Sequence, residues 1–220
     1  MASEDRKTYG QMCALAMALD RVGDRWTMLI MRELLGGPAR FSELKEGLPG
    51  IATNLLTTRL RRLELDGLVR RSGGYNTTYS LTTIGSGIRS ALHELGQWGF
   101  NLGPMGDAAP LTSARSLAMP LQSILGSIRA EMGDAEHFVV ELEVDGSLIE
   151  LILADGLTAT ARPAVDADSR ARSTVAKISA LLLSAEHNAA TVEHVDGDEA
   201  ATAALSELMA TAAQMATAQV

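Results

Sequence analysis

The chain has 220 residues, of which 46% are hydrophobic and 21% are charged, and its formal net charge is −8. A chain of this size can bury a sizeable core, and we expect two domains of ordinary size. No run of about 18 apolar residues is present to cross a bilayer, and the N-terminal segment is polar, unlike a signal peptide. These features predict a cytoplasmic protein. A single cysteine, Cys13, excludes an internal disulfide and a multi-cysteine zinc site.

The charge is divided unevenly along the chain. Residues 1–103 carry 13 Lys and Arg against 10 Asp and Glu, whereas residues 104–220 carry 6 against 17. This asymmetry indicates that only the first half meets a polyanion such as DNA. Prolines and glycines interrupt the apolar periodicity where the two halves join. We therefore predict one domain over residues 1–103, a linker over 104–114 and a second domain over 115–220.

In chain order, apolar residues spaced three and four apart predict helices over residues 9–22, 25–35 and 40–48. Asp24 is placed to cap the second helix. A fourth helix is predicted to begin at Thr53 and to end at Asp66-Gly67. On its helical wheel, the buried side consists of Leu56, Leu60 and Leu63.

The outward face of the fourth helix suits the major groove of DNA. It carries small polar groups and arginines: Thr53, Asn54, Thr57, Thr58, Arg59, Arg61 and Arg62. Asparagine can pair with adenine, arginine can pair with guanine, and threonine offers a hydroxyl or a methyl contact to thymine. On this helix alone, an ordinary solvated face is an equal alternative, because surface helices usually have polar outer faces.

Two short β-prone runs, residues 68–72 and 76–81, predict a hairpin that carries Arg70 and Arg71. A helix-turn-helix followed by a small basic hairpin is a winged helix, and this order favours DNA binding over a solvated face. A last helix over residues 82–100 has more apolar surface than so small a domain needs. We expect a subunit interface to use its apolar side, which consists of Ile84, Ile88, Leu92, Leu95 and Trp98 or Gly99.

From Cys13 to Trp98 the chain resembles the HxlR-type winged-helix regulators of bacteria, which are relatives of the MarR type. The segments that carry the resemblance are CALAMALDRVGDRWTMLIMRELLGG, RFSELKEGLPGI, LLTTRLRRLELDGLVRR and YSLTTIG. The resemblance implies a homodimer that binds a short palindromic operator in double-stranded DNA, usually to repress transcription. The positions that it implies for groove reading are Thr53, Asn54, Thr57, Thr58 and Arg61, and those for phosphate contact are Arg70 and Arg71.

Two departures from the family pattern concern the DNA-reading elements. Ala52 stands where the family commonly has serine, so the helix cap must move to Thr53 or be missing. The wing segment GGYN is also shorter than the family's, and such a wing reaches less far into the minor groove.

Cys13 falls where many members of the family carry a cysteine, which in some of them senses electrophiles or oxidants. Thiol-based redox regulation through Cys13 is therefore one alternative. A reactive thiol needs nearby cations to depress its pKa, and the residues one turn away are Tyr9, Gly10, Ala16 and Met17. We therefore favour a buried structural cysteine.

The second half predicts a helix broken near Pro120 and then three alternating strands over residues 137–144, 147–154 and 157–162. Asp-Gly turns join these strands into an antiparallel meander. Helices over residues 174–184 and 198–215 cover one face, and residues 190–195 could add a strand. The predicted fold class is α+β, with an N-terminal winged helix-turn-helix domain followed by a smaller α/β domain whose antiparallel sheet is covered by helices.

This second half resembles a sterol carrier protein type two domain, in the meander, in the strand-then-helix around RARSTVAKISALLL and in the terminal helix. Such domains enclose an apolar tunnel that binds lipids or other hydrophobic small molecules. The candidate lining residues are Phe138, Val140, Leu151, Leu153, Ile178, Leu182, Leu205, Leu208 and Met209. Each of them could equally be plain core, which is the commoner role of an apolar stripe.

Patterns of metal, nucleotide or paired-cysteine chemistry are not found, and the four histidines lie in separate predicted elements. We expect no metal, no cofactor and no catalytic residue. The resulting hypothesis is a dimeric, DNA-binding transcriptional regulator, modulated by an apolar small molecule in its second domain. The rival from another class is a lipid or hydrophobic-ligand carrier that uses the winged helix only for dimerisation.

Overall fold

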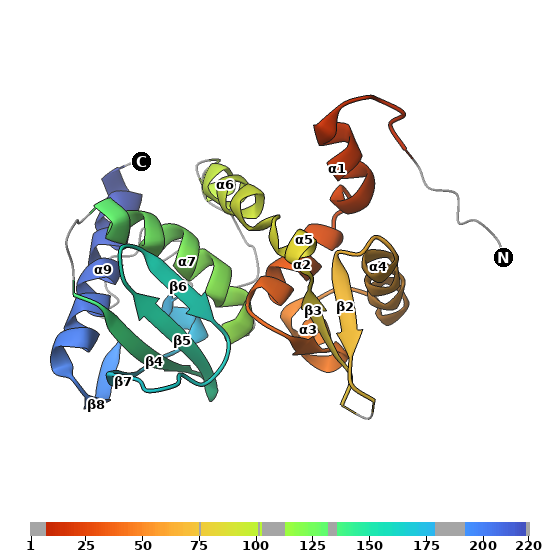
Figure 1. Ribbon diagram of the computed structural model, residues 1–220. Coiled ribbons are helices and arrows are strands. Elements are labelled where there is room, and N and C mark those ends of the chain that lie inside the picture. The colour runs from red at the N-terminus through yellow and green to blue at the C-terminus, as the bar shows by residue number, and fades with distance from the viewer. Residues whose placement is uncertain are drawn as a thin grey trace. The chain divides into compact units, whose positions relative to one another are not determined.

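The computed structural model describes residues 8–74, 76–100, 102, 113–131, 136–178 and 192–218 (Figure 1). Its contacts divide the chain into two compact units, Met1–Leu34 with Pro38–Ile88 and Leu35–Gly37 with Arg89–Val220. The predicted division of the chain at residue 103 stays a prediction. Most of the predicted linker lies outside the described residues, of which it includes only Ser113 and Ala114. None of the described helices is long and apolar enough to cross a membrane.

The first unit is a winged helix-turn-helix. Its helices are α1 (Ala14–Val22), α2 (Thr27–Leu35), α3 (Phe41–Gly47), α4 (Thr53–Leu65) and α5 (Thr83–Ser86). Its strands are β1 (Ala39–Arg40), β2 (Val69–Ser72) and β3 (Thr78–Leu81), which form an antiparallel sheet in the order β1-β3-β2. The predicted hairpin of β2 and β3 is confirmed, and β1 adds a short strand that the sequence pattern did not indicate.

The predicted apolar faces of α2, α3 and α4 form the core of this unit. Leu56, Leu60 and Leu63 of α4 are each at most 1% exposed, as are Ile30 of α2 and Leu44 of α3. The end of α4 is also as predicted, because Gly67 takes a left-handed φ of 69° and Leu68 donates its N–H to the Leu63 carbonyl at 2.9 Å. The outward face of α4 is therefore fixed by burial of its leucines.

Two of the predicted helices have different bounds. Helix α1 begins at Ala14 and not at Tyr9, and Cys13 is its N-cap. The helix expected over residues 82–100 is two helices, α5 and α6 (Arg89–Phe100), because Gly87 ends the first of them. The Thr82 hydroxyl donates to the Gly67 carbonyl at 2.7 Å and accepts from the Gly85 N–H at 3.0 Å, so it joins the start of α5 to the end of α4.

The second unit, which includes α6, is built on a five-stranded sheet in the order β6-β5-β4-β7-β8. The strands are β4 (Phe138–Val144), β5 (Ser147–Leu153), β6 (Leu157–Thr160), β7 (Ser169–Ser173) and β8 (Glu193–Gly197). The predicted meander of β4, β5 and β6 is confirmed, and Asp145 and Gly146 at its first turn both have positive φ.

The sheet is mixed, so the prediction of an antiparallel sheet is wrong beyond the meander. Strand β7 pairs with β4 in parallel, and β8 pairs with β7 antiparallel. The connection from β6 to β7 crosses the sheet, since the backbone N–H of Ala164 donates to Glu141 and that of Val165 donates to Glu150. This crossover puts β7 on the far side of β4.

Helices α7 (Ala114–Glu131) and α9 (Glu199–Ala218) cover one face of this sheet (Figure 1). The predicted break near Pro120 is wrong, because α7 continues through it. A proline inside a helix costs about 3 kcal/mol. Leu117, Leu121 and Leu125 of α7 are all 0% exposed, and burying a leucine contributes about 1.5–3 kcal/mol, so their packing outweighs the cost.

Candidate nucleic-acid interface

Helix α4 presents a continuous polar face to solvent. Thr53, Asn54, Thr57, Thr58 and Arg61 are all exposed, while Arg59 and Arg62 are half-buried. The spacing of three and four residues that buries the leucines on one side puts these five side chains on the other. The residues predicted to read the groove are thus brought together on one accessible surface.

The threonine hydroxyls of this face are used within α4. Thr57 Oγ1 donates to the Thr53 carbonyl and Thr58 Oγ1 donates to the Asn54 carbonyl, each at 2.9 Å. These bonds run back one turn to the residue four positions earlier, a common pattern for threonine in a helix. The pattern could not be read from the sequence, because it depends on the rotamers of the two side chains.

The start of α4 has no side-chain cap. Ala52 is the N-cap residue, and its side chain cannot accept a hydrogen bond. Of the two predicted alternatives, a cap moved to Thr53 or a missing cap, the structure has the second. The Asn54 Oδ1 instead accepts from the Leu55 N–H at 2.9 Å. Because the first N–H groups of a helix otherwise have no intrahelical partners, this end of α4 favours an anion such as a phosphate.

Arg59 of α4 forms an ion pair with Asp24, which lies just before α2. Its Nε lies 3.1 Å from Asp24 Oδ1, and the two side chains are 32% and 30% exposed. Asp24 Oδ1 also accepts from the N–H groups of Trp26 at 3.1 Å and Thr27 at 3.2 Å, so it caps α2 as predicted. Asp24 therefore links the start of α2 to α4, a second role that the capping pattern alone did not reveal.

The wing is a two-stranded hairpin in which the two arginines have different environments. Arg70 lies opposite Ser80 in the register, and its Nε donates to Ser80 Oγ at 2.9 Å. Arg71 lies opposite Tyr79 and is exposed, with no side-chain hydrogen bond to another described residue. Both guanidinium groups lie at the solvent surface of β2, where they can meet a phosphate backbone.

Cys13 is exposed, so the prediction of a buried structural cysteine is wrong. Cys13 is the N-cap residue of α1, although its side chain makes no capping hydrogen bond. The nearby backbone N–H groups of Ala16 first, and of Leu15 second, lower the pKa of the thiol because they favour the thiolate. The sequence shows no cation near Cys13, and these N–H donors can be recognised only once the start of the helix is known.

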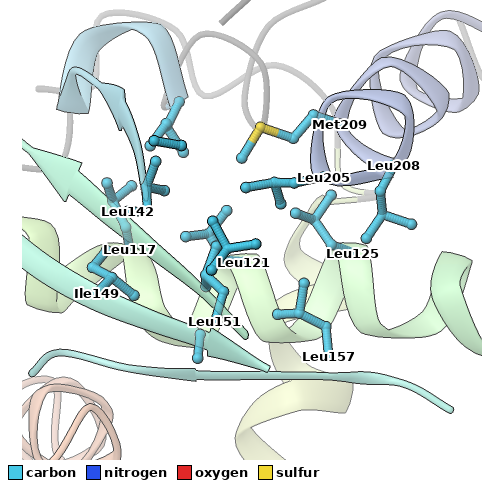
Figure 2. Close-up of a cluster of buried hydrophobic side chains, with 14 of the residues drawn as sticks. Leu117, Leu121, Leu125, Leu142, Ile149, Leu151, Leu157, Leu205, Leu208 and Met209 are labelled. Carbon is cyan, nitrogen blue, oxygen red and sulfur yellow. The ribbon is translucent and has the colours of Figure 1, made fainter. Parts of the chain in front are cut away.

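The predicted ligand-lining residues of the second unit belong to its core (Figure 2). Val140, Leu151, Leu153, Ile178, Leu205, Leu208 and Met209 are each 0% or 1% exposed, and Phe138 packs against the same cluster. Leu182 lies outside the described residues. Side chains from the sheet, α7 and α9 cover one another, which is how core residues behave, and a ligand among them stays a prediction.

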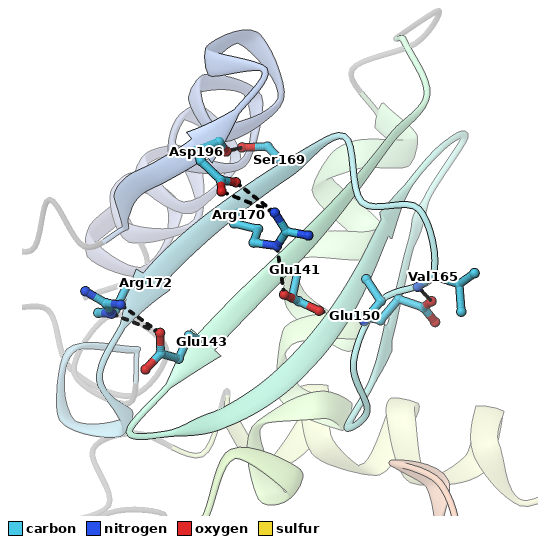
Figure 3. Close-up of polar contacts among 9 residues, drawn as sticks. Glu141, Glu143, Glu150, Val165, Ser169, Arg170, Arg172 and Asp196 are labelled. Atoms are coloured by element: carbon cyan, nitrogen blue, oxygen red, sulfur yellow. Dashed lines mark hydrogen bonds and ion pairs between the residues drawn. The ribbon is translucent and has the colours of Figure 1, made fainter.

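The opposite face of this sheet is a ladder of charged side chains (Figure 3). Arg170 contacts Glu141 and Asp196, each at 3.2 Å, and these carboxylates raise its pKa, with Asp196 contributing most. Arg172 contacts Glu143 at 2.9 Å. Because the arginines are matched by carboxylates, this face does not resemble the basic surface that binds DNA. Among the described residues, no group of three or more side chains is placed to hold a metal ion.

Comparison with known proteins places the first half of the chain in a family. A family model described as HxlR-like helix-turn-helix matches residues 21–106. An HTH-type transcriptional regulator of Bacillus subtilis, YvaP, is 38% identical over 93 residues, which are 40% of this chain and 86% of YvaP. The chain belongs to the HxlR-like helix-turn-helix family. A second B. subtilis regulator, YkvN, is 38% identical over 40% of this chain and 77% of its own length.

Solved structures of similar sequence cover about two fifths of this HxlR-like chain. The redox regulator HypR in its reduced form is 30% identical over 40% of this chain and 90% of that chain, with a TM-score of 0.38. Quinone-bound YodB from B. subtilis is 33% identical over 39% of this chain and 93% of that chain, with a TM-score of 0.36. The family match ends at residue 106, and the likeness of the second half to a sterol carrier domain stays a prediction.

Proposed function

We propose that this HxlR-like chain is a homodimeric repressor of transcription. It binds a palindromic operator in double-stranded DNA. In each protomer, α4 enters the major groove and the β2–β3 wing lies on the phosphate backbone. The observation that carries the proposal is the exposed row on α4 of Thr53, Asn54, Thr57, Thr58 and Arg61. Opposite it, leucines anchor the helix in the core.

The electrostatics of the chain support this orientation. The first 103 residues have an excess of three positive charges, and the remaining residues have an excess of eleven negative charges. Phosphate contacts from Arg70, Arg71 and Arg62 would supply affinity, while groups on the exposed face of α4 would supply sequence preference. The acidic half would be kept away from DNA by repulsion.

The apolar surface of α6 supports a homodimer. Leu95 and Trp98 are 44% and 60% exposed, although they are large hydrophobic residues that usually find a covering partner. A twofold axis would duplicate α4, and two copies spaced about 34–36 Å apart reach successive major grooves on one side of a duplex. The dimer would therefore read both halves of a palindrome.

A hydrophobic small molecule in the second unit would regulate binding only if it favours one arrangement of the two recognition helices. The fused architecture is what supports this part of the proposal. An apolar molecule that binds the chain and leaves its operator affinity unchanged would refute the coupling. A carrier that uses the winged helix only to dimerise is less well supported, because the polar face of α4 would then have no role.

A thiol switch through Cys13 is a second candidate function. The exposed thiol and its lowered pKa favour it, as does the resemblance to regulators that carry a cysteine at this position. Oxidation or alkylation of Cys13 would then change operator affinity. An identical response of the Cys13→Ser variant to oxidants and electrophiles would eliminate this function.

The deciding experiment is a mobility-shift titration of the full chain on duplexes from its own upstream region and on a scrambled duplex. Operator binding should weaken steeply as salt rises from 50 to 200 mM, by a factor on the order of 10³ if about six phosphates are contacted. Arg71→Ala should reduce the salt slope by about one unit on every duplex. A titration that does not respond to salt would overturn the proposal.

A further inference from the structure

The two exposed threonines in the middle of α4 have already used the hydrogens of their hydroxyl groups. Thr57 donates to the Thr53 carbonyl and Thr58 donates to the Asn54 carbonyl. A hydroxyl group has one hydrogen to donate and two lone pairs that accept. Each threonine can therefore offer a base its methyl group and an acceptor, but no donor unless the bond to the backbone is broken.

A methyl group combined with an acceptor matches one kind of base pair. In the major groove an A·T pair presents the thymine methyl group and the adenine N6 amino donor. A G·C pair presents the cytosine N4 donor but has no methyl group, and guanine presents acceptors alone. The two threonines are thus complementary to A·T and mismatched to guanine.

Arg61 has the opposite chemistry. Its side chain is exposed and makes no hydrogen bond to another described residue, so its donors remain available. A guanidinium group pairs bidentately with O6 and N7 of guanine. Arg59, two positions earlier, is paired with Asp24 instead. The Arg62 side chain also makes no hydrogen bond to another described residue, but it is half-buried. Arg61 is therefore the exposed arginine of α4, and its donors are free to read a base.

The spacing along the helix sets the spacing along the DNA. Thr57 and Arg61 are four residues apart, which is one turn and a rise of about 6 Å. Bases along one strand are about 3.4 Å apart. With α4 lying along the groove, the two side chains meet base pairs that are about one or two steps apart.

We propose that α4 reads a half-site in which a thymine, contacted by the methyl groups of Thr57 and Thr58, lies one or two base pairs from a guanine contacted by Arg61. This rests on the proposed function, since it requires α4 to enter the major groove. It adds the base composition of the operator and gives the methyl groups, not the hydroxyls, the reading role.

The first experiment selects binding sites from a pool of random duplexes with the full-length chain at fixed salt. The selected half-site should contain T and G within two positions of each other. Thr57→Val and Thr58→Val, which keep a methyl group in place, should select the same thymine. Arg61→Ala should lose the guanine preference and bind the selected site about 5- to 150-fold more weakly. A selected half-site without this pair would overturn the inference.

The second experiment removes the methyl group from the DNA. Replacing the selected thymine with deoxyuracil should weaken binding of the native chain about fourfold, the factor that corresponds to one buried methyl-sized group. The same replacement should have no effect on the Thr57→Ser, Thr58→Ser double variant, which lacks the partner methyl groups. Equal weakening of both proteins would show that the threonine methyls do not contact this base.

The two experiments separate this inference from the proposed function. Salt-dependent binding to duplex DNA with no enriched sequence would overturn base reading by α4 and leave the DNA-binding function standing. An absence of binding to any duplex would overturn the function and the inference together. Thermal unfolding of each variant checks its fold, and substitutions at these exposed positions should leave the unfolding temperature nearly unchanged.

Discussion

Asp24 illustrates how one side chain serves two elements of the helix-turn-helix. It caps α2 through the N–H groups of Trp26 and Thr27, and it is paired with Arg59 of α4. The cap depends on an acceptor oxygen, whereas the pair depends on charge. Substitutions that retain one and remove the other can therefore separate the two contributions.

We predict that Asp24→Ala lowers the free energy of unfolding by ~1–2 kcal/mol, because both the cap and the ion pair are lost. Asp24→Ser keeps a capping oxygen and should cost less than about 1 kcal/mol, the usual worth of a partly exposed ion pair. Urea unfolding followed by circular dichroism measures both. Equal losses for the two variants would mean that the cap contributes nothing.

Cys13 carries a prediction about pH. Because backbone N–H groups at the start of α1 lower its pKa, the thiolate forms at a lower pH in the folded chain than in the unfolded chain. The rate of alkylation by iodoacetamide should therefore rise at a lower pH for the native protein than for the same protein in guanidinium chloride. Coinciding pH profiles would contradict the role of the helix start.

At the scale of elements, the face of the five-stranded sheet opposite α7 and α9 shows how solvent exposure determines the contribution of an ion pair to stability. Arg162 pairs with Glu150 at 2.5 Å, and the Glu150 side chain is only 5% exposed. Arg172 pairs with Glu143 at 2.9 Å, where the carboxylate side chain is 36% exposed. Both arginines are more than half exposed, so the two pairs differ mainly in the burial of the acid.

Replacing each of these arginines with alanine should give different results. Arg162→Ala leaves a buried carboxylate without its cation and should cost ~1–3 kcal/mol of stability. Arg172→Ala leaves a carboxylate that water can reach and should cost less than about 1 kcal/mol. Chemical denaturation of the two variants side by side makes the comparison. If Arg172→Ala were the more damaging change, the argument from burial would fail.

The elements that the sequence predicted well are those whose periodicity and end signals agree. The leucine face of α4 and its Asp66-Gly67 end are both confirmed. Periodicity shows which residues share a face but not what covers that face. The expectation that Cys13 is buried rested on the absence of nearby cations in the sequence, and the exposed thiol shows that it is wrong. Strand β7 was indicated only through a resemblance, because its buried residues are the small Ser169, Ala171 and Ser173 between exposed arginines.

The candidate site, too, was predictable from the sequence only in part. Which residues of α4 face outward follows from the wheel, and the structure agrees for Thr57, Thr58 and Arg61. What each can donate or accept does not follow from the wheel. It depends on the threonine rotamers, which set the bonds to the backbone four residues earlier, and on the ion pair from Asp24, which requires the tertiary arrangement.

At the scale of the whole molecule, the proposed function requires two copies of α4 to act together. A single recognition helix contacts few bases, and a palindromic site gains its affinity because both halves are bound at once. In the proposed dimer, the surface that joins the two copies would therefore be as important to DNA binding as the surface that meets the bases. On α6 the exposed Trp98 is the largest side chain available for that role.

We predict that Trp98→Glu weakens the dimer, because a carboxylate placed in an apolar interface loses its hydration without gaining a partner. Sedimentation velocity at micromolar concentration should show a shift from dimer toward monomer, and operator affinity should fall at least tenfold. Val165→Glu is the matched control. Val165 is 71% exposed in the crossover of the second unit, so this variant should keep the native mass and affinity. Native behaviour of Trp98→Glu would exclude this face of α6 from the subunit interface.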